Sequence, residues 1–169
     1  IAQAMLLLML LTVPAVAQNA CPKVGIYTSA DIAKKQAETG VRFDHVLKFQ
    51  TIDKLDHSKL TKFLDAGLGV ILNIEFKDSY ANLKDIAAGK YDNQLLDFAL
   101  AAKRDGRLLW LRPLHEANGN WYNWAVFYDD KTTTADYRAA FRHVVRLMRS
   151  TGAPLKFQVN LNRKNGKNK

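Results

Sequence analysis

From residue 20 onward, short apolar runs alternate with amphipathic stretches, and this alternation is the strongest constraint on the fold. The apolar runs are typical of strands covered on both faces, and we expect strands at residues 24–27, 44–49, 68–75, 108–112 and 156–161. The intervening stretches carry apolar residues at helical spacing, and we expect helices at residues 30–38, 58–66, 93–103 and 135–149. Strands that alternate with helices pair in parallel through right-handed crossovers. The sequence therefore predicts an α/β fold.

Glycines and hydroxyl side chains mark the ends of the expected helices. The glycines stand where helix C-caps belong, at Gly40, Gly67, Gly106 and Gly152. Ser58 and Thr134 stand where N-caps are expected. Two architectures fit this pattern, an open doubly wound sheet and a (β/α)8 barrel. The sequence has neither a GxGxxG nor a Walker motif, so the nucleotide-binding form of the open sheet is disfavoured.

The composition is that of an ordinary globular domain. The chain has 169 residues, of which 48% are apolar and 24% charged, so we expect one domain. Its net charge of +9 is concentrated near the C-terminal end, because nine Lys or Arg and no Asp or Glu lie from Arg138 onward. Such a patch could attract an acidic polymer or an anionic surface. The sequence has no nucleic-acid motif, and we expect no nucleic-acid partner. With Cys21 as its single cysteine, the chain can form neither an internal disulfide nor a cysteine-based zinc cluster.

The N-terminal segment is expected to be a targeting signal. Met5–Ala17 is thirteen residues long and uncharged, which is too short to span a bilayer comfortably. It ends in Ala15-Val16-Ala17, a small-x-small cleavage pattern. We therefore expect residues 1–17 to be a signal peptide clipped at its start, and residues 18–169 to be secreted or periplasmic, with no membrane attachment after cleavage. A buried core helix and lipidation at Cys21 are the alternatives.

The segment from Leu108 to Trp124 gathers the residues best suited to chemistry. An apolar strand ends at Arg112, and a cluster of polar and aromatic residues follows: His115, Glu116, Asn118, Trp121, Tyr122 and Trp124. In a barrel, side chains at the carboxyl ends of the strands form the active site. Aromatic faces pack on sugar rings while polar groups bind hydroxyls, so the cluster suits a carbohydrate. A carboxyl group among aromatic rings is costly to ionise, which makes Glu116 a candidate general acid.

Residues 112–124, RPLHEANGNWYNW, resemble the strand-four signature of glycoside hydrolase family 26, whose members are mainly β-mannanases. Residues 86–92 and 24–27 are also similar to that family, so the resemblance runs through most of the expected mature chain. It implies a secreted retaining hydrolase with a (β/α)8 fold, of which this chain holds a part, about the first five strands. The departures are Ala117, where Met is common, and Asn123, where Pro is common.

The resemblance also implies roles for individual residues. Glu116 would be the acid/base, His115 would support it by hydrogen bonding, and Asn118 would help to position the site. Trp121 would stack on a sugar near the cleavage point, and Tyr122 and Trp124 would join it in binding an endo-cleaved β-1,4-mannan or a related β-glycan. Retaining hydrolysis needs no cofactor. No metal is expected either, because His115-Glu116 is not followed by the second histidine of an HExxH motif.

A retaining hydrolase needs a second carboxyl group, about 5–5.5 Å from the first. The nucleophile of the resembled family is a Glu at the end of strand seven, whereas this chain has three glutamates, Glu38, Glu75 and Glu116. We therefore expect a fragment of a longer enzyme, with little hydrolysis by the isolated chain. One alternative makes Glu75, at the end of the third strand, the nucleophile. The other is a non-catalytic polysaccharide-binding protein or decayed hydrolase, with a sugar platform of Trp121, Tyr122 and Trp124.

Overall fold

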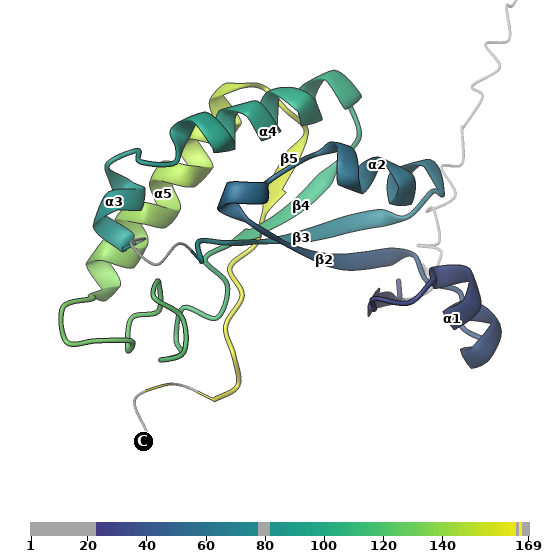
Figure 1. Ribbon diagram of the computed structural model, residues 1–169, viewed down its shortest axis with the longest axis horizontal. Coiled ribbons are helices and arrows are strands. Elements are labelled where there is room, and N and C mark those ends of the chain that lie inside the picture. Colours follow the sequence, from purple (N-terminus) through teal and green to yellow (C-terminus); the bar gives the residue numbers. More distant parts are fainter. Residues whose placement is uncertain (1–22, 78–81, 165, 167–169) are drawn as a thin grey trace, which may run out of the picture.

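A computed structural model describes residues 23–77, 82–164 and 166 of the chain (Figure 1). The predicted signal peptide at residues 1–17 and Cys21 lie outside the described residues. The strands form one parallel sheet in the order β1-β2-β3-β4-β5. Their bounds are Gly25–Tyr27 (β1), His45–Thr51 (β2), Gly69–Glu75 (β3), Leu109–Pro113 (β4) and Leu155–Phe157 (β5). The predicted α/β fold is confirmed, and strands that neighbour one another in chain order are consistent with part of a (β/α)8 barrel.

The helices follow the strands as predicted, with two short additions. Their bounds are Ile32–Thr39 (α1), Ser58–Asp65 (α2), Leu83–Ala87 (α3), Asp92–Asp105 (α4) and Thr134–Ser150 (α5), and Ile52–Lys54 forms a 3₁₀ turn (η1). Helices α2 to α5 lie on one side of the sheet, and α1 lies near its β1 edge (Figure 1). None of the described helices is both long enough and apolar enough to cross a membrane.

The face of the sheet toward these helices forms the hydrophobic core. Alternate strand residues point to the same face, and those on this face have no exposed surface: Val46, Val70, Leu72, Leu109 and Leu111. They belong to one cluster with helix residues that include Leu60, Leu95, Phe98, Val144 and Met148. Full burial of each such side chain contributes about 1.5–3 kcal/mol. This layer therefore holds the strands against the helices.

The opposite face of the sheet carries a second layer that becomes polar toward the strand ends. The register places four side chains next to one another, Tyr27, Leu47, Ile71 and Trp110. Two residues further along β3 and β4, Asn73 is paired in register with Arg112. The Arg112 Nε donates to the Gln158 Oε1 at 2.7 Å. This face corresponds to the inside of a barrel, and its polar end leads to the candidate site.

Two predicted helix N-caps shift by one residue. Ser58 was expected to cap α2, but it is the first helical residue, and its backbone N–H donates to the Asp56 carboxylate at 2.9 Å. Thr134 was expected to cap α5, but Thr133 does so in a capping box with Asp136. In both cases a nearby carboxylate accepts hydrogen bonds at the helix start, which the pattern of apolar residues does not encode.

The fifth strand is shorter than predicted. It ends at Phe157, whereas the sequence pattern extended it to residue 161. The next residues turn to the loop after β4 instead: the Glu116 N–H donates to the Asn160 carbonyl at 2.8 Å, and the Asn162 N–H donates to the Asn118 Oδ1 at 2.8 Å. The apolar residues of this stretch remain exposed, with Val159 at 58% and Leu161 at 59%. Hydrogen bonds to the loop therefore replace pairing with β4.

Candidate active site

The candidate site begins with a sharp turn at the carboxyl end of β4. Leu114 and Glu116 have φ angles of 55° and 54°, in the left-handed region, which costs a non-glycine residue about 1–2 kcal/mol. Two hydrogen bonds hold the turn. The Glu116 N–H donates to the Asn160 carbonyl, and the Trp124 indole N–H donates to the His115 carbonyl, both at 2.8 Å. The turn thus holds His115 and Glu116 at the strand end.

The carboxylate of Glu116 is held by two side chains from different segments. Its Oε2 accepts a hydrogen bond from the Trp121 indole at 2.9 Å, and its Oε1 accepts one from the Asn162 amide at 2.9 Å. Hydrogen bonds to a charged group contribute roughly 1.5–3 kcal/mol each. The carboxyl group is therefore fixed in orientation while its residue remains partly exposed.

Asn118 connects the loop after β4 to the segment after β5. Its Nδ2 donates to the Asn162 carbonyl at 2.7 Å, and its Oδ1 accepts from the Asn162 N–H at 2.8 Å. This two-way bond places the Asn162 side chain against Glu116. Asn118 is therefore connected to Glu116 through Asn162, in keeping with its predicted positioning role. A direct contact between Asn118 and substrate stays a prediction. Asn162 was missed by sequence reasoning, because no spacing or motif relates it to a residue 46 positions earlier.

The three aromatic residues of the site differ in exposure. Trp121 is 42% exposed, whereas Trp124 is completely buried. Tyr122 lies between these extremes and stacks on Trp124, with ring centroids 4.4 Å apart and planes 10° from parallel. Trp121, and in part Tyr122, therefore present ring surface that a ligand can contact. Trp124 supports Tyr122 from the core, and a direct contact between Trp124 and substrate stays a prediction.

His115 lies behind the carboxylate in an aromatic cage. The residue is 2% exposed, and its ring packs against Phe49, Tyr122 and Trp124 with centroid distances of 5.5, 4.9 and 5.6 Å. Neither ring nitrogen has a hydrogen-bond partner among the described residues. Burial lowers the pKa of His115, against the opposing attraction of Glu75 and Glu116. The imidazole is therefore neutral near pH 7.

Glu75, at the end of β3, joins the site from the neighbouring strand. It is 7% exposed, and its Oε1 lies 3.9 Å from the His115 Nε2. The same oxygen accepts a hydrogen bond from the Lys77 ammonium at 2.8 Å, which raises the pKa of Lys77. The structure therefore brings Glu75 to the site, as its place at a strand end predicted, and pairs it with a cation. Nothing in the sequence marked Lys77 as that partner.

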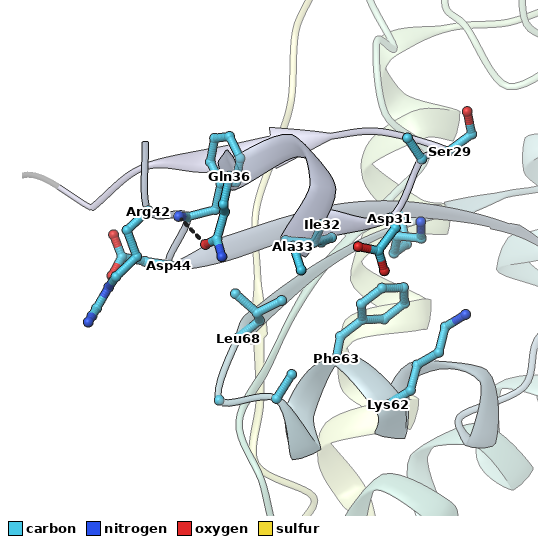
Figure 2. A pocket seen from close by; sticks show the side chains of 15 residues that line it. Ser29, Asp31, Ile32, Ala33, Gln36, Arg42, Asp44, Lys62, Phe63 and Leu68 are labelled. Carbon is cyan, nitrogen blue, oxygen red and sulfur yellow. Dashed lines mark hydrogen bonds and ion pairs between the residues drawn. The ribbon is translucent and has the colours of Figure 1, made fainter. Parts of the chain in front are cut away.

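A large cavity lies elsewhere, between α1 and α2 (Figure 2). Its volume is about 820 Å³, and none of the predicted site residues lines it. The Phe43 N–H donates to the Gln36 Oε1 at 2.9 Å on one side. On the other side, the Lys48 and Lys62 ammonium groups lie 4.8 and 5.0 Å from the ring centroid of Phe63. This cavity is therefore separate from the candidate site.

The candidate site is thus a fixed carboxylate beside an exposed indole, backed by a neutral imidazole and a paired carboxylate. This set can donate and accept protons next to a ligand that stacks on Trp121. Within the part of the chain that the structure describes, no group of three or more His, Cys, Asp or Glu is arranged to hold a metal ion.

The fold and the site together define an α/β protein of barrel type with a glutamate held at the end of its fourth strand. The structure is similar to the crystal structure of the YdhT protein from Bacillus subtilis, with a TM-score of 0.65. The match covers 85% of this chain and 57% of that chain, at 16% sequence identity. At this identity the likeness concerns the fold alone.

The sequence is similar to Endoglucanase H from Acetivibrio thermocellus, with 34% identity over 150 residues. The alignment covers 82% of this chain and 17% of the relative, so the chain spans about a sixth of that protein's length. No protein-family model matches the chain. The chain is therefore a homologue of a segment of an endoglucanase, while membership of glycoside hydrolase family 26 and a preference for mannan stay predictions.

Proposed function

We propose that the protein is an endo-acting glycoside hydrolase that cleaves a β-1,4-linked glycan. The observation that carries this proposal is the Glu116 carboxylate, which is held by Trp121 and Asn162 at the end of β4. The similarity to Endoglucanase H supports the class of reaction. The resemblance of residues 112–124 to the family 26 signature favours mannan as the glycan. The partner of the site is then a polysaccharide.

In the proposed mechanism, Glu116 acts first as a general acid and then as a general base. It protonates the oxygen that leaves the anomeric carbon, while a second carboxylate forms a bond to that carbon. Glu116 then takes a proton from the water that hydrolyses the glycosyl-enzyme bond, and the anomeric configuration is retained. The hydrogen bonds from Trp121 and Asn162 hold its oxygens in place for both proton transfers. The reaction requires no cofactor.

The aromatic residues and Asn118 support this chemistry in different ways. The exposed ring of Trp121 stacks on a sugar next to the cleaved bond, and Tyr122 extends the surface. Trp124 keeps Tyr122 in place through the stacked contact. Asn118 holds the segment that carries Asn162. His115, neutral and caged, supports the strand end on which Glu116 stands.

The nucleophile is not assigned within this chain. Of its three glutamates, Glu38 lies on α1 and pairs with Lys35, while Glu75 is paired with Lys77 at 2.8 Å. The Glu75 Oε1 accepts from the Lys77 ammonium and lies 3.9 Å from the His115 Nε2, so this oxygen belongs to the contacts behind Glu116. The proposal therefore treats Glu75 as part of the support, and expects the isolated chain to hydrolyse little or no glycan.

The test uses the protein as its gene encodes it, with two variants at Glu116 and one control variant at Glu38. Glu116→Gln should lower kcat/KM on polysaccharide by about 10²–10⁴-fold, the usual contribution of a general acid. Glu116→Ala should keep most of its first step on an aryl glycoside whose leaving group needs no protonation. Glu38→Gln is the matched control and should leave kcat/KM unchanged. Undiminished hydrolysis of polysaccharide by Glu116→Gln would refute the proposed role.

The substrate is identified by measuring kcat/KM on four polysaccharides: mannan, β-1,4-glucan, mixed-linkage glucan and xylan. We expect the highest kcat/KM on mannan, and Trp121→Ala should raise KM on the preferred glycan. A preference for glucan would keep the hydrolase proposal and overturn the mannan assignment.

A second candidate function is non-catalytic polysaccharide binding, which the exposed indole of Trp121 favours. In this case the encoded protein would bind glycan in affinity gels without turnover. Trp121→Ala would abolish binding, and Glu116→Gln would leave it unchanged.

We also propose that the protein acts outside the cytoplasm, as a secreted or periplasmic enzyme. The proposal rests on the uncharged stretch Met5–Ala17 and its small-x-small end. Expression in a bacterial host and mass spectrometry of the exported protein should find a mature N-terminus at Gln18. Full retention in the cytoplasm would refute it.

A further inference from the structure

Four arginines run in a row along the solvent side of α5. Each of them is exposed, and their positions are Arg138, Arg142, Arg146 and Arg149. At 3.6 residues per turn they fall within an arc of about 80°, along roughly 16 Å of helix. The buried residues of this helix, Ala140, Val144 and Met148, are centred about 160° away around the axis. We call these four residues the arginine row, and it faces away from the core.

The charge of the arginine row is not neutralised within the described structure. None of its members forms an ion pair with a described carboxylate. The one acidic residue of α5, Asp136, is bound to Thr133 in the capping box. At the other end, the Arg149 guanidinium lies 5.5 Å from the ring centroid of Phe157, which holds it in place. The row is thus a linear array of guanidinium groups that have no carboxylate partner among the described residues.

The shape of the row selects among anionic partners. A bilayer surface favours helices that also present apolar side chains, and no residue of α5 is among the exposed large apolar residues. Single-stranded nucleic acid is bound by stacking on aromatic rings, which the exposed face of α5 lacks. Duplex DNA presents one negative charge per about 1.7 Å of its axis, which is much denser than the four arginines along roughly 16 Å of α5. Of these anionic partners, a flexible linear polymer with single, spaced negative charges fits the arginine row best.

We propose that the arginine row binds an acidic polysaccharide through the carboxylates of its uronic acid residues. A guanidinium group presents two parallel N–H donors that match the two oxygens of a carboxylate. Successive arginines on one helix face meet successive charges along an extended chain, so weak contacts add up. This surface would hold the protein on an acidic polymer, and it differs from the site around Glu116 in both charge and location.

The experiment is native affinity electrophoresis of the full chain in gels that contain polygalacturonate. The test variant carries Arg→Gln at all four positions of the row. The control variant removes the same charge from exposed cations elsewhere, at Lys34, Arg42, Lys59 and Lys131. Both variants take the net charge from +9 to +5, since each loses four charges. Because the substituted side chains are exposed, both should keep the circular dichroism spectrum of the parent.

We expect the row variant to bind polygalacturonate about tenfold more weakly, as four weak surface contacts predict, and the control variant to bind almost as well as the parent. Binding should disappear between about 0.05 and 0.5 M NaCl. Equal losses in the two variants would overturn the proposal, because net charge alone would then explain the binding. Stronger retention by duplex DNA, by a polyphosphate or by vesicles of anionic lipid would overturn the choice of polymer.

A neutral mannan gel separates this proposal from the hydrolase proposal. Trp121→Ala should reduce retention by mannan and leave retention by polygalacturonate unchanged, while the row variant should do the reverse. Normal retention of the row variant by polygalacturonate would refute the arginine row as a binding surface and leave the proposal for Glu116 intact.

Discussion

His115 makes the folding stability of the protein sensitive to mild acid. The residue is 2% exposed, and neither ring nitrogen has a hydrogen-bond partner among the described residues. Burial lowers its pKa below the ordinary value of 6.5; Glu75 and Glu116 act against this shift, and Lys77 and Arg112 add to it. In the unfolded chain the same imidazole takes up a proton near its ordinary pKa. Protonation therefore favours the unfolded chain.

The size of the effect follows from proton linkage. Between the unfolded pKa and the lower folded pKa, the unfolded state binds more protons, so the free energy of unfolding falls as the pH falls. The stability is fully present above about pH 6.5, and each unit below it removes up to about 1.4 kcal/mol per such histidine. The loss stops at the folded pKa. His57, which is 6% exposed and whose pKa burial also lowers, adds a second contribution of the same sign.

The assay is urea unfolding of the parent, His115→Gln and His57→Gln between about pH 7.5 and pH 5.5. Each variant should lose stability at pH 7.5 and show a shallower dependence on pH, by up to about 1.4 kcal/mol per unit below pH 6.5. The carboxylate of Asp105 titrates below this window, because the hydrogen bond from Arg107 lowers its pKa. A dependence in His115→Gln as steep as in the parent would refute the assignment of a neutral buried imidazole.

Three further predictions test single contacts of the fold and the site. Asn162→Ala removes one hydrogen bond to Glu116 and should lower kcat of the encoded protein about tenfold, as a loss of about 1.5 kcal/mol implies. The control is Asn120→Ala, which loses a 3.4 Å bond to the Gly166 carbonyl and should have little effect on kcat. Thr133→Ala removes the N-cap of α5 and should cost about 1 kcal/mol in urea unfolding, whereas Thr134→Ala should be almost neutral. Lys77→Met leaves the buried Glu75 carboxylate without its cation. Because Lys77 is half exposed, the free energy of unfolding should fall by about 1–2 kcal/mol. In a double-mutant cycle, adding Glu75→Gln to Lys77→Met should restore most of that loss.

The order of strands and helices could be predicted because it is encoded in local apolar patterns. All five predicted strands and four predicted helices are present, with ends that differ by a few residues. The prediction from local patterns was wrong where contacts with residues distant in the sequence determine the structure. Val159 and Leu161 read as strand residues, but backbone hydrogen bonds to residues 116 and 118 draw this stretch away from β4. Helix α3 is only five residues long and has no periodic signal of its own.

The candidate site was predictable where its residues are neighbours in sequence. Glu116, His115 and Trp121 stand within seven positions, and the structure keeps them together at the end of β4. What the sequence could not show is which groups complete them. Asn162 reaches Glu116 across 46 residues. The burial of Trp124, next to an exposed Trp121, depends on the turn through Leu114 and Glu116 rather than on residue type.

These contacts make the site depend on how the fifth strand docks. The segment after β5 supplies the carbonyl that holds the Glu116 backbone, the amide that holds its carboxylate, and the backbone groups that bind Asn118. Four hydrogen bonds with Asn160 and Asn162 therefore hold a turn in which two residues have left-handed angles. The strain of that turn, about 2–4 kcal/mol in total, is comparable with the net contribution of four such bonds. Undocking of the segment would release the strain, so the oriented carboxylate and the β4–β5 pairing should form and melt together.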